Sequence, residues 1–246
     1  MSFLRVGVST AILLTSMVGL TPASTTLSAL AQTPNTCQGS TATIAGTSGS
    51  DNIVGTQGRD VIVTLGGADT VHALGGADTI CGGPGDDYLV GGNGDDFLRG
   101  DNGNDEFFGN AGDDTILGNA GDDSISAEDG DDFINGNEGD DRLFGGDGND
   151  DLTGGSVFGA GDDDDPAGDD ELHGGNGLDT IFGNGGDDFL DGNAGDDRLF
   201  SGNGNDNLFG SAGDDFLNGG ANTDSGDGGP DFDTCVNIET VTNCEA

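Results

Sequence analysis

The sequence contains no lysine and no tryptophan, and its basic side chains are five arginines and two histidines. The 5 arginines stand against 47 aspartates and glutamates, which gives the 246-residue chain a formal net charge of −42. Because nucleic-acid recognition needs a basic surface, this balance excludes that class of partner. The partners that remain are cations and basic surfaces.

The signatures of common enzymes are missing as well. Without lysine there is no P-loop of the Walker type, and neither H-E-x-x-H nor G-x-S-x-G occurs. The two histidines, His72 and His173, lie far apart in the sequence and are predicted to be surface residues. We therefore expect no catalytic site.

Long hydrophobic runs are absent except at the start, where Arg5 precedes the segment VGVSTAILLTSMVGL (6–20). Residues 1–31 are predicted to be a secretory signal peptide of the Sec type, with an A-x-A cleavage site at 29–31. A cut after Ala23 is one alternative; a retained anchor is another, although the run is short of the about 20 residues of a span. We expect a secreted, extracellular protein, free or associated with a cell surface, and residues 32–45 as an N-terminal cap.

Only four cysteines occur, and an even number in an exported chain indicates disulfides. Proximity in the sequence favours the pairs Cys37–Cys81 and Cys235–Cys244, one at each end of the processed chain. A zinc site made by all four cysteines is the alternative, but no C-x2-C spacing supports it.

Glycine, in contrast, is abundant, with 51 residues, and it is regularly spaced. In rows of nine residues, twelve rows run from 46 to 153 and six more from 165 to 218. Every row has glycine at position four, aspartate at position six and an apolar residue at position eight, as in GGNGDDFLR (91–99). Such a period identifies a repeat architecture, in which stacked units share one core.

The rows resemble the RTX, or hemolysin-type, calcium-binding nonapeptide repeat, G-G-x-G-x-D-x-U-x. The resemblance implies an all-β fold, a right-handed parallel β-roll (a calcium-dependent β-helix solenoid) in which two rows make one coil. It also implies Ca²⁺ ligands at position six of each row. These are Asp51, Asp60, Asp69, Asp78, Asp87, Asp96, Asp105, Asp114, Asp123, Asp132, Asp141, Asp150, Asp170, Asp179, Asp188, Asp197, Asp206 and Asp215.

The residue types agree with this chemistry. Each row is expected to form a six-residue turn and a three-residue strand whose middle residue, at position eight, points inward. One inward side chain per strand gives a core too thin to offset a backbone ordering cost of about 1–2 kcal/mol per residue. Carboxylate and carbonyl oxygens of stacked turns suit Ca²⁺ better than Mg²⁺ or Zn²⁺. We expect up to about sixteen sites between turns, and a chain that folds only when they are filled.

The remaining segments lack the full pattern. Residues 154–164, GGSVFGAGDDD, are predicted to be an insertion loop, and 219–246 to be degenerate repeats and a C-terminal cap. In the cap, Asp224 and Asp233 keep position six, but their rows lack the glycine at position four, so they are not assigned as ligands.

Aromatic side chains concentrate at the outward positions seven and nine. Since Phe182 and Phe200 are two rows apart, they are expected to stack on one sheet. Strand propensity alone explains such residues; a partner surface or self-association is the alternative. The expected function is thus calcium binding with a structural or surface-interaction role, or else a calcium-dependent adhesin recognising glycan, cell wall or ice. The outward phenylalanines are Phe97, Phe108, Phe133, Phe144, Phe182, Phe189, Phe200, Phe209 and Phe216.

Overall fold

The computed structural model describes residues 36–155 and 168–244. The expected signal peptide (1–31), the first residues of the expected N-terminal cap and most of the 154–164 insertion lie outside the described residues.

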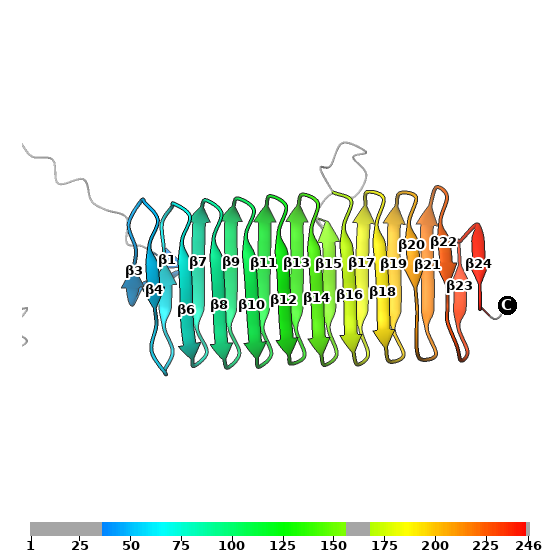
Figure 1. The fold of residues 1–246 in the computed structure, drawn as a ribbon, viewed down its shortest axis with the longest axis horizontal. Helices are drawn as coiled ribbons and strands as arrows, with labels where there is room; N and C mark the ends of the chain where they lie inside the picture. The colour runs from blue at the N-terminus through cyan, green and yellow to red at the C-terminus, as the bar shows by residue number, and fades with distance from the viewer. Residues whose placement is uncertain (1–35, 156–167, 245–246) are drawn as a thin grey trace, which may run out of the picture. The chain divides into compact units, whose positions relative to one another are not determined.

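Two 11-stranded sheets form the described part of the chain, together with a short hairpin (Figure 1). The hairpin pairs β1 (Thr36–Cys37) with β2 (Ser40–Thr41). The first sheet consists of β3 (Ile44–Ala45), β5 (Val61–Val63), β7 (Thr79–Pro84), β9 (Phe97–Asn102), β11 (Thr115–Ala120), β13 (Phe133–Glu138), β15 (Asp151–Gly155), β17 (Thr180–Gly185), β19 (Arg198–Asn203), β21 (Phe216–Ala221) and β23 (Thr234–Val236). The second consists of β4 (Asn52–Val54), β6 (Thr70–Gly75), β8 (Tyr88–Asn93), β10 (Glu106–Ala111), β12 (Ser124–Asp129), β14 (Arg142–Asp147), β16 (Glu171–Asn176), β18 (Phe189–Ala194), β20 (Asn207–Phe209), β22 (Ser225–Asp227) and β24 (Thr240–Thr242).

Successive strands alternate between the two sheets, so each strand pairs in parallel with the strand two places along the chain. Leu89 of β8, for example, lies opposite Phe107 of β10. The result is a parallel β-solenoid of about 10 turns with about 18 residues per turn, which confirms the β-roll expected from the repeat. Within 36–155 and 168–244 there is no helix, hence none long and apolar enough for a bilayer.

The interior is a single cluster of apolar side chains, to which each strand from β4 to β21 contributes its position-eight residue. Every residue at position eight, from Ile53 to Leu217, is at most 8% exposed and belongs to one hydrophobic cluster. Phe107 is the largest of the fully buried side chains. The expected inward direction of position eight is therefore correct, and the core is as thin as the repeat predicted.

The strands are longer than the three residues expected. Most span six, as in β11 (Thr115–Ala120), because the chain remains paired through positions one to three of the next row. Position two takes a left-handed conformation, with φ of 81° at Asn110 and 83° at Asn119. Asparagine and glycine tolerate this region better than other residues, which explains their frequency at position two.

The glycine at position four has a steric cause. Gly94 has φ of 121°, and a Cβ on it would collide with the carbonyl oxygen of Gly76, one coil earlier. Successive turns thus approach so closely at this position that a side chain cannot be placed between them.

The insertion leaves the register of the sheet intact. Leu143 of β14 pairs with Leu172 of β16 across it. The inserted residues therefore lengthen one coil, while the pairing on either side continues as in the rest of the roll.

The extra residues begin slightly later than the row pattern predicts. That pattern starts the insertion at Gly154, but in the structure Gly154 and Gly155 end strand β15. A Cβ on Gly154 would meet Asp170 Oδ2, so Gly154 occupies the place of position one, to which the row pattern assigns Asp165. The inserted residues therefore follow Gly155.

Both expected disulfides are present. Cys37–Cys81 joins the β1–β2 hairpin to β7, with Cα atoms 5.8 Å apart. Around it Val61 and Val63 form a second small hydrophobic cluster on the outer side of the sheet. Cys235–Cys244, also with a Cα separation of 5.8 Å, joins β23 to the end of the described chain.

Candidate metal centre

The position-six aspartates form two continuous ladders, one at each end of the strands. In each ladder the Oδ1 of one aspartate accepts a hydrogen bond from the backbone N–H of the aspartate one coil earlier, as Asp105 does from Asp87 at 2.7 Å. The first inner ladder contains Asp51, Asp69, Asp87, Asp105, Asp123, Asp141, Asp170, Asp188, Asp206 and Asp224. The second contains Asp60, Asp78, Asp96, Asp114, Asp132, Asp150, Asp179, Asp197, Asp215 and Asp233.

All eighteen aspartates predicted from the sequence thus lie in the inner ladders, and all but Asp51 are buried. The ladders also continue across the insertion, where Asp170 accepts from Asp141 at 2.8 Å. Sequence reasoning left out Asp224 and Asp233, which extend the ladders by one coil. Their position-six spacing was the signal that could have identified them.

The second carboxylate oxygen of most ladder residues has no hydrogen-bond partner. Asp69, Asp78, Asp87, Asp96, Asp105, Asp114, Asp123, Asp132, Asp141, Asp150, Asp170, Asp179, Asp188, Asp197, Asp206, Asp215 and Asp224 each bury Oδ2 in this way. Leaving so many buried acceptors unsatisfied is costly, and native proteins rarely do it. These buried oxygens therefore need a donor or a positive charge from outside the chain.

The glycine at position one makes room for that oxygen. A Cβ placed on Gly192 would lie 2.5 Å from Asp197 Oδ2 and 3.0 Å from the carbonyl oxygen of Gly210 in the next coil. Carboxylate and carbonyl oxygens of two coils thus converge at a position that has no side chain. The same arrangement recurs along both ladders, for example at Gly82, Gly100 and Gly174.

Burial makes these carboxylates hard to ionise. It raises the pKa of Asp105, Asp141 and Asp188 from 3.8 to about 8, although the backbone N–H bond to each one lowers the pKa in part. Neighbouring ladder aspartates raise the pKa further, since Asp123 and Asp87 both act on Asp105. At neutral pH the array either takes up protons or requires counter-charge from outside the chain.

The chain's own cations do not supply that charge. Among the described residues, arginine ion pairs join Arg99 to Asp101 and Arg142 to Glu171, each at 2.8 Å and each at the surface. Neither pair involves a ladder aspartate.

The donor set fits a hard divalent cation. Within 36–155 and 168–244 no group of three or more His, Cys, Asp or Glu side chains converges as a transition-metal centre would require. What the ladders offer is one unpartnered carboxylate oxygen at a time, with backbone carbonyl oxygens around it. An all-oxygen site with several carbonyl ligands is typical of Ca²⁺.

The N-terminal rungs differ from the rest. Asp51 Oδ2 accepts hydrogen bonds from Thr47 N at 2.6 Å and Thr47 Oγ1 at 3.0 Å. Asp60 Oδ2 accepts from Thr56 N at 2.7 Å and Thr56 Oγ1 at 2.9 Å. In these two rungs a threonine at position two completes the carboxylate that is left unpartnered elsewhere.

Two further rows fill the space at position one with a hydroxyl. Thr64 Oγ1 donates to the carbonyl oxygen of Gly82, and Ser201 Oγ donates to that of Gly219 at 2.7 Å. Both side chains are fully buried. The carbonyl oxygens are thus engaged by the protein itself in these two rows, in which Thr64 and Ser201 replace the glycine of position one.

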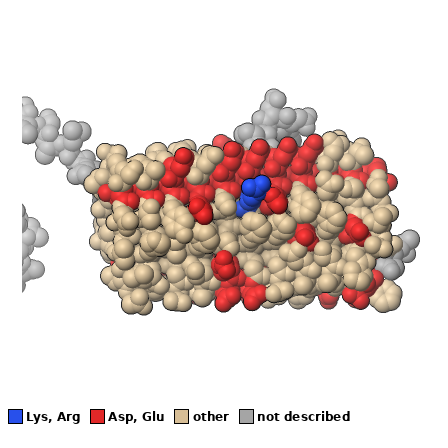
Figure 2. Space-filling model, viewed as in Figure 1, with Lys and Arg blue, Asp and Glu red and all other residues tan. Residues whose placement is uncertain are grey.

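A second, exposed set of acids lies outside the inner ladders. The position-five acids Asp86, Asp95 and Asp113 are exposed and accept backbone hydrogen bonds from the following coil. Figure 2 shows acidic side chains gathered along one edge of the visible face, where the turns lie. They surround the ladders with negative potential, which attracts cations.

Aromatic rings form stacks on the outer faces of both sheets. Phe182 and Phe200 stack with centroids 5.1 Å apart, as their spacing predicted. On the other sheet Phe144 stacks on His173 at 5.0 Å, and His173 contacts Phe189. Phe144 is 38% exposed, so the cluster is open to solvent.

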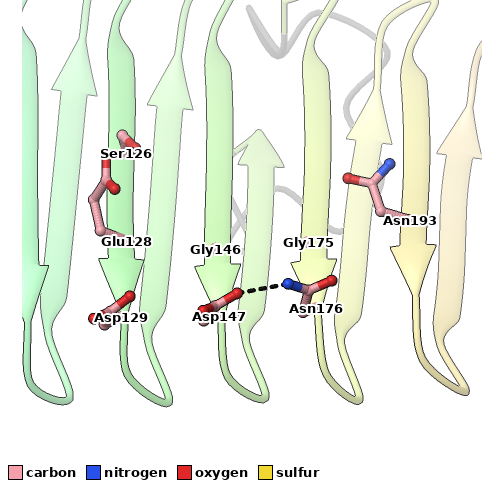
Figure 3. Close-up of a pocket in the computed structure, with 8 residues that line it drawn as sticks. All are labelled: Ser126, Glu128, Asp129, Gly146, Asp147, Gly175, Asn176 and Asn193. Carbon is pink, nitrogen blue, oxygen red and sulfur yellow. Dashed lines mark hydrogen bonds between the residues drawn. The ribbon is translucent and has the colours of Figure 1, made fainter.

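The described surface carries a shallow polar hollow. A shallow hollow on the β12–β14–β16 sheet is lined by backbone, carboxylate and amide groups, including Glu128, Asp129 and Asn193 (Figure 3). Asn176 Nδ2 donates to Asp147 Oδ1 across it at 2.6 Å. Ser126 Oγ donates to Glu128 Oε1 at 2.9 Å in this hollow, but the pair is exposed and no histidine lines the hollow. No catalytic domain is identified in the chain.

Comparison with known proteins agrees with this geometry. The family profile of the RTX calcium-binding nonapeptide repeat (four copies) matches residues 45–80, 82–116, 108–143, 126–158, 167–199 and 200–235. A comparison with curated proteins gives no match. The matched segments lie between residues 45 and 235 and contain all eighteen predicted ladder residues, so the chain belongs to the RTX calcium-binding nonapeptide repeat family.

Proposed function

We propose that this is a secreted calcium-binding protein whose β-roll is folded by Ca²⁺ held between successive coils, and whose role is structural or surface-interacting. The observation that carries the proposal is the row of buried, unpartnered Oδ2 atoms along both inner ladders. The family assignment implies calcium binding independently of that observation.

The residues that would hold the ions are the ladder aspartates and the carbonyl oxygens that converge with them at position one. Of the eighteen predicted ligands, those that we propose to hold ions are the ladder aspartates from Asp69 to Asp150 and from Asp170 to Asp215. Asp51 and Asp60 fulfil the same structural role through Thr47 and Thr56 and need no ion. We expect up to about sixteen sites, close to the number between coils.

Calcium supplies the positive charge that the buried carboxylates lack. The chain contributes the rest: backbone N–H groups fix Oδ1, glycines without Cβ admit Oδ2, and position eight packs the core. Because most strands add only one inward apolar side chain, the free energy of ion binding is here largely the free energy of folding. Without calcium we expect a chain that is mostly disordered, since its acids then only repel one another.

Export agrees with the chemistry of the site. Repeats of this family together with two disulfides are typical of an extracellular location. Residues 1–31, proposed as a signal peptide, would deliver the chain to a compartment where calcium is abundant. Affinities of about 10⁻⁴–10⁻³ M, as in other extracellular modules, suffice there.

Calorimetric calcium titration combined with far-UV circular dichroism tests the proposal. We expect uptake of many ions, with β signal appearing in step with binding. A processed chain that keeps its full β signal in excess chelator, or that takes up only one or two ions, contradicts it.

The aromatic stacks favour a second candidate function, a calcium-dependent binding module for glycan or cell wall. Rings such as Phe144, His173 and Phe189 form a continuous apolar strip across neighbouring strands. Such strips bind the flat faces of sugars or other apolar surfaces. A polysaccharide pull-down with and without calcium, using Phe144→Ser and Phe189→Ser as variants, separates this function from a purely structural one.

A further inference from the structure

The last coil of the roll ends on an acid that does not belong to the repeat. Continued with the same spacing, the ladder through Asp224 would reach position 242, which is a threonine. Instead the backbone N–H of Asp224 donates to Glu239 Oε2 at 2.8 Å. Glu239 of the C-terminal cap thus takes the place that the next aspartate occupies everywhere else in the ladder.

Asp224 has the burial and the hydrogen bonding of an interior ladder residue. It is 1% exposed, and its Oδ1 accepts from the N–H of Asp206 at 3.0 Å. Its Oδ2 is buried and has no hydrogen-bond partner. A Cβ on Gly219 would lie 2.6 Å from that oxygen and 2.6 Å from the carbonyl oxygen of Asn237, so both oxygens converge there.

The cap holds Asn237 and Glu239 in place through several contacts. Asn237 has φ of 53°, which turns the chain, and its Nδ2 donates to Asn218 at 2.9 Å. Ile238 packs on the end of the core, against Gly226, whose row lacks an apolar residue at position eight. Thr240 N donates to the carbonyl oxygen of Asp224 at 3.1 Å, so the cap continues the sheet over this coil.

Two carboxylates therefore meet at the end of the roll without a cation from the chain. In the described segments neither Asp224 nor Glu239 forms an ion pair with arginine or histidine. A buried carboxylate oxygen, a second carboxylate and a carbonyl oxygen are ligands for a hard divalent ion. Glu239 is 15 residues from Asp224, a spacing that the nonapeptide repeat does not contain.

We propose that Asp224, Glu239 and the carbonyl oxygen of Asn237 form a terminal divalent-cation site that closes the C-terminal cap on the roll. This inference rests on the proposed function, because it takes the same ion, but it adds a ligand from outside the repeat. The ion at this site fastens residues 237–242 to the last coil. Its loss frays residues 237–242, which lie between the two half-cystines of Cys235–Cys244, before the interior coils open, because coils at the end of the roll have a neighbour on one side only.

The absence of tryptophan allows a local test with terbium as the probe ion. Val241 is 45% exposed in β24 and pairs with Gly226, two residues after Asp224. In a Val241→Trp background, the new indole sensitises terbium bound at the cap, because energy transfer falls steeply with distance. The readout is the terbium concentration at half-maximal sensitised emission, and competition by calcium.

The decisive variant is Glu239→Gln, which keeps an oxygen for the Asp224 N–H and removes the charge. We expect terbium to bind about tenfold more weakly, the order of effect expected for losing a ligand charge. The matched control is Asp231→Asn, which removes one exposed acid of the same segment and should leave the curve unchanged. Equal curves for the two variants overturn the proposal, and so does a parent protein without sensitised emission.

The outcomes also distinguish this inference from the proposed function. If the parent binds many calcium ions by calorimetry but shows no terbium signal at the cap, the terminal site alone is refuted. If the chain binds no calcium at all, the proposed function fails together with it. Hydrogen exchange of residues 225–244 checks that Glu239→Gln leaves the interior coils folded.

Discussion

Replacing one interior ladder aspartate by asparagine should change stability in opposite directions with and without calcium. Asp105 is 2% exposed; its Oδ1 accepts from Asp87 N at 2.7 Å, and its Oδ2 is unpartnered. Asparagine keeps the oxygen that accepts the hydrogen bond from the Asp87 N–H. Its NH₂ group replaces Oδ2, which converges with the carbonyl oxygen of Gly118 at the position of a Gly100 Cβ. Asp105→Asn therefore removes the charge and preserves the ladder.

The two magnitudes follow from the site. With calcium at about 100 times its dissociation constant, one site contributes about 2.7 kcal/mol, so Asp105→Asn should destabilise the loaded protein by roughly this amount. Without calcium, burial raises the pKa of Asp105 from 3.8 to about 8. At about 1.4 kcal/mol for each pKa unit, an ionised Asp105 costs the calcium-free roll up to about 6 kcal/mol above pH 8. The substitution removes most of that cost.

The assay compares two transitions. Thermal melting in saturating calcium measures the loss, and the osmolyte concentration that induces β signal in the calcium-free chain measures the gain. Asp113→Asn is the control, because Asp113 is exposed and belongs to position five. A change of the same sign in both states, or an equal effect of Asp113→Asn, would refute the assignment of Asp105 as a buried ligand.

Three further outcomes are expected. Burial raises the pKa of Asp114 and Asp170 from 3.8 to about 8, as for Asp105, so protons stabilise the calcium-free fold fully below about pH 3.8, and this stabilisation is lost as the pH rises through about 8. The β signal of the calcium-free chain in circular dichroism should therefore increase when the pH is lowered from about 9 to about 5. An unchanged spectrum would contradict the burial of these groups. After chelation, residues 36–81 should exchange amide hydrogens most slowly, because Thr47, Thr56 and the Cys37–Cys81 bond replace ions there. Thr56→Val should reduce the difference in exchange rate between this segment and the central coils. Faster exchange in residues 36–81 than in the central coils would argue against this reasoning. Deleting residues 156–166 restores the regular coil spacing between Asp141 and Asp170. The calcium stoichiometry and the melting temperature should stay almost unchanged, because the entropy of loop closure changes slowly with loop length. A lower stoichiometry would show that the inserted residues complete a calcium site.

The periodic part of the structure could be predicted from the sequence because each periodic position has one physical task. Side chains alternate along a strand, so position eight faces the opposite way from positions seven and nine. Apolar residues at this position, such as Leu143 and Ile181, therefore face the core. Position six follows from the repeat, and the disulfides from proximity. The resemblance carried by this spacing was therefore sufficient for the β-roll and for the eighteen position-six aspartates, and the spacing itself for the stacking of Phe182 on Phe200.

The parts that were missed depend on contacts that have no period. Thr47 and Thr56 complete their aspartates through hydrogen bonds that only the folded turn shows, although threonine at position two of both rows was visible. Glu239 reaches Asp224 from an irregular cap. Gly154 rather than Asp165 occupies position one, because only the structure shows that a Cβ there would meet Asp170 Oδ2.

The nearest-neighbour pairing of every coil has a mechanical consequence. Each coil touches only the coils before and after it, so a pull on the two ends of the roll loads one interface at a time. Rupture should proceed as a series of similar steps, each releasing one coil, or about 60 Å of extended chain. The Cys37–Cys81 bond, with its sequence separation of 44, keeps the first coils out of this series. The protein would then act as an extensible tether whose yield force is set by the surrounding calcium concentration.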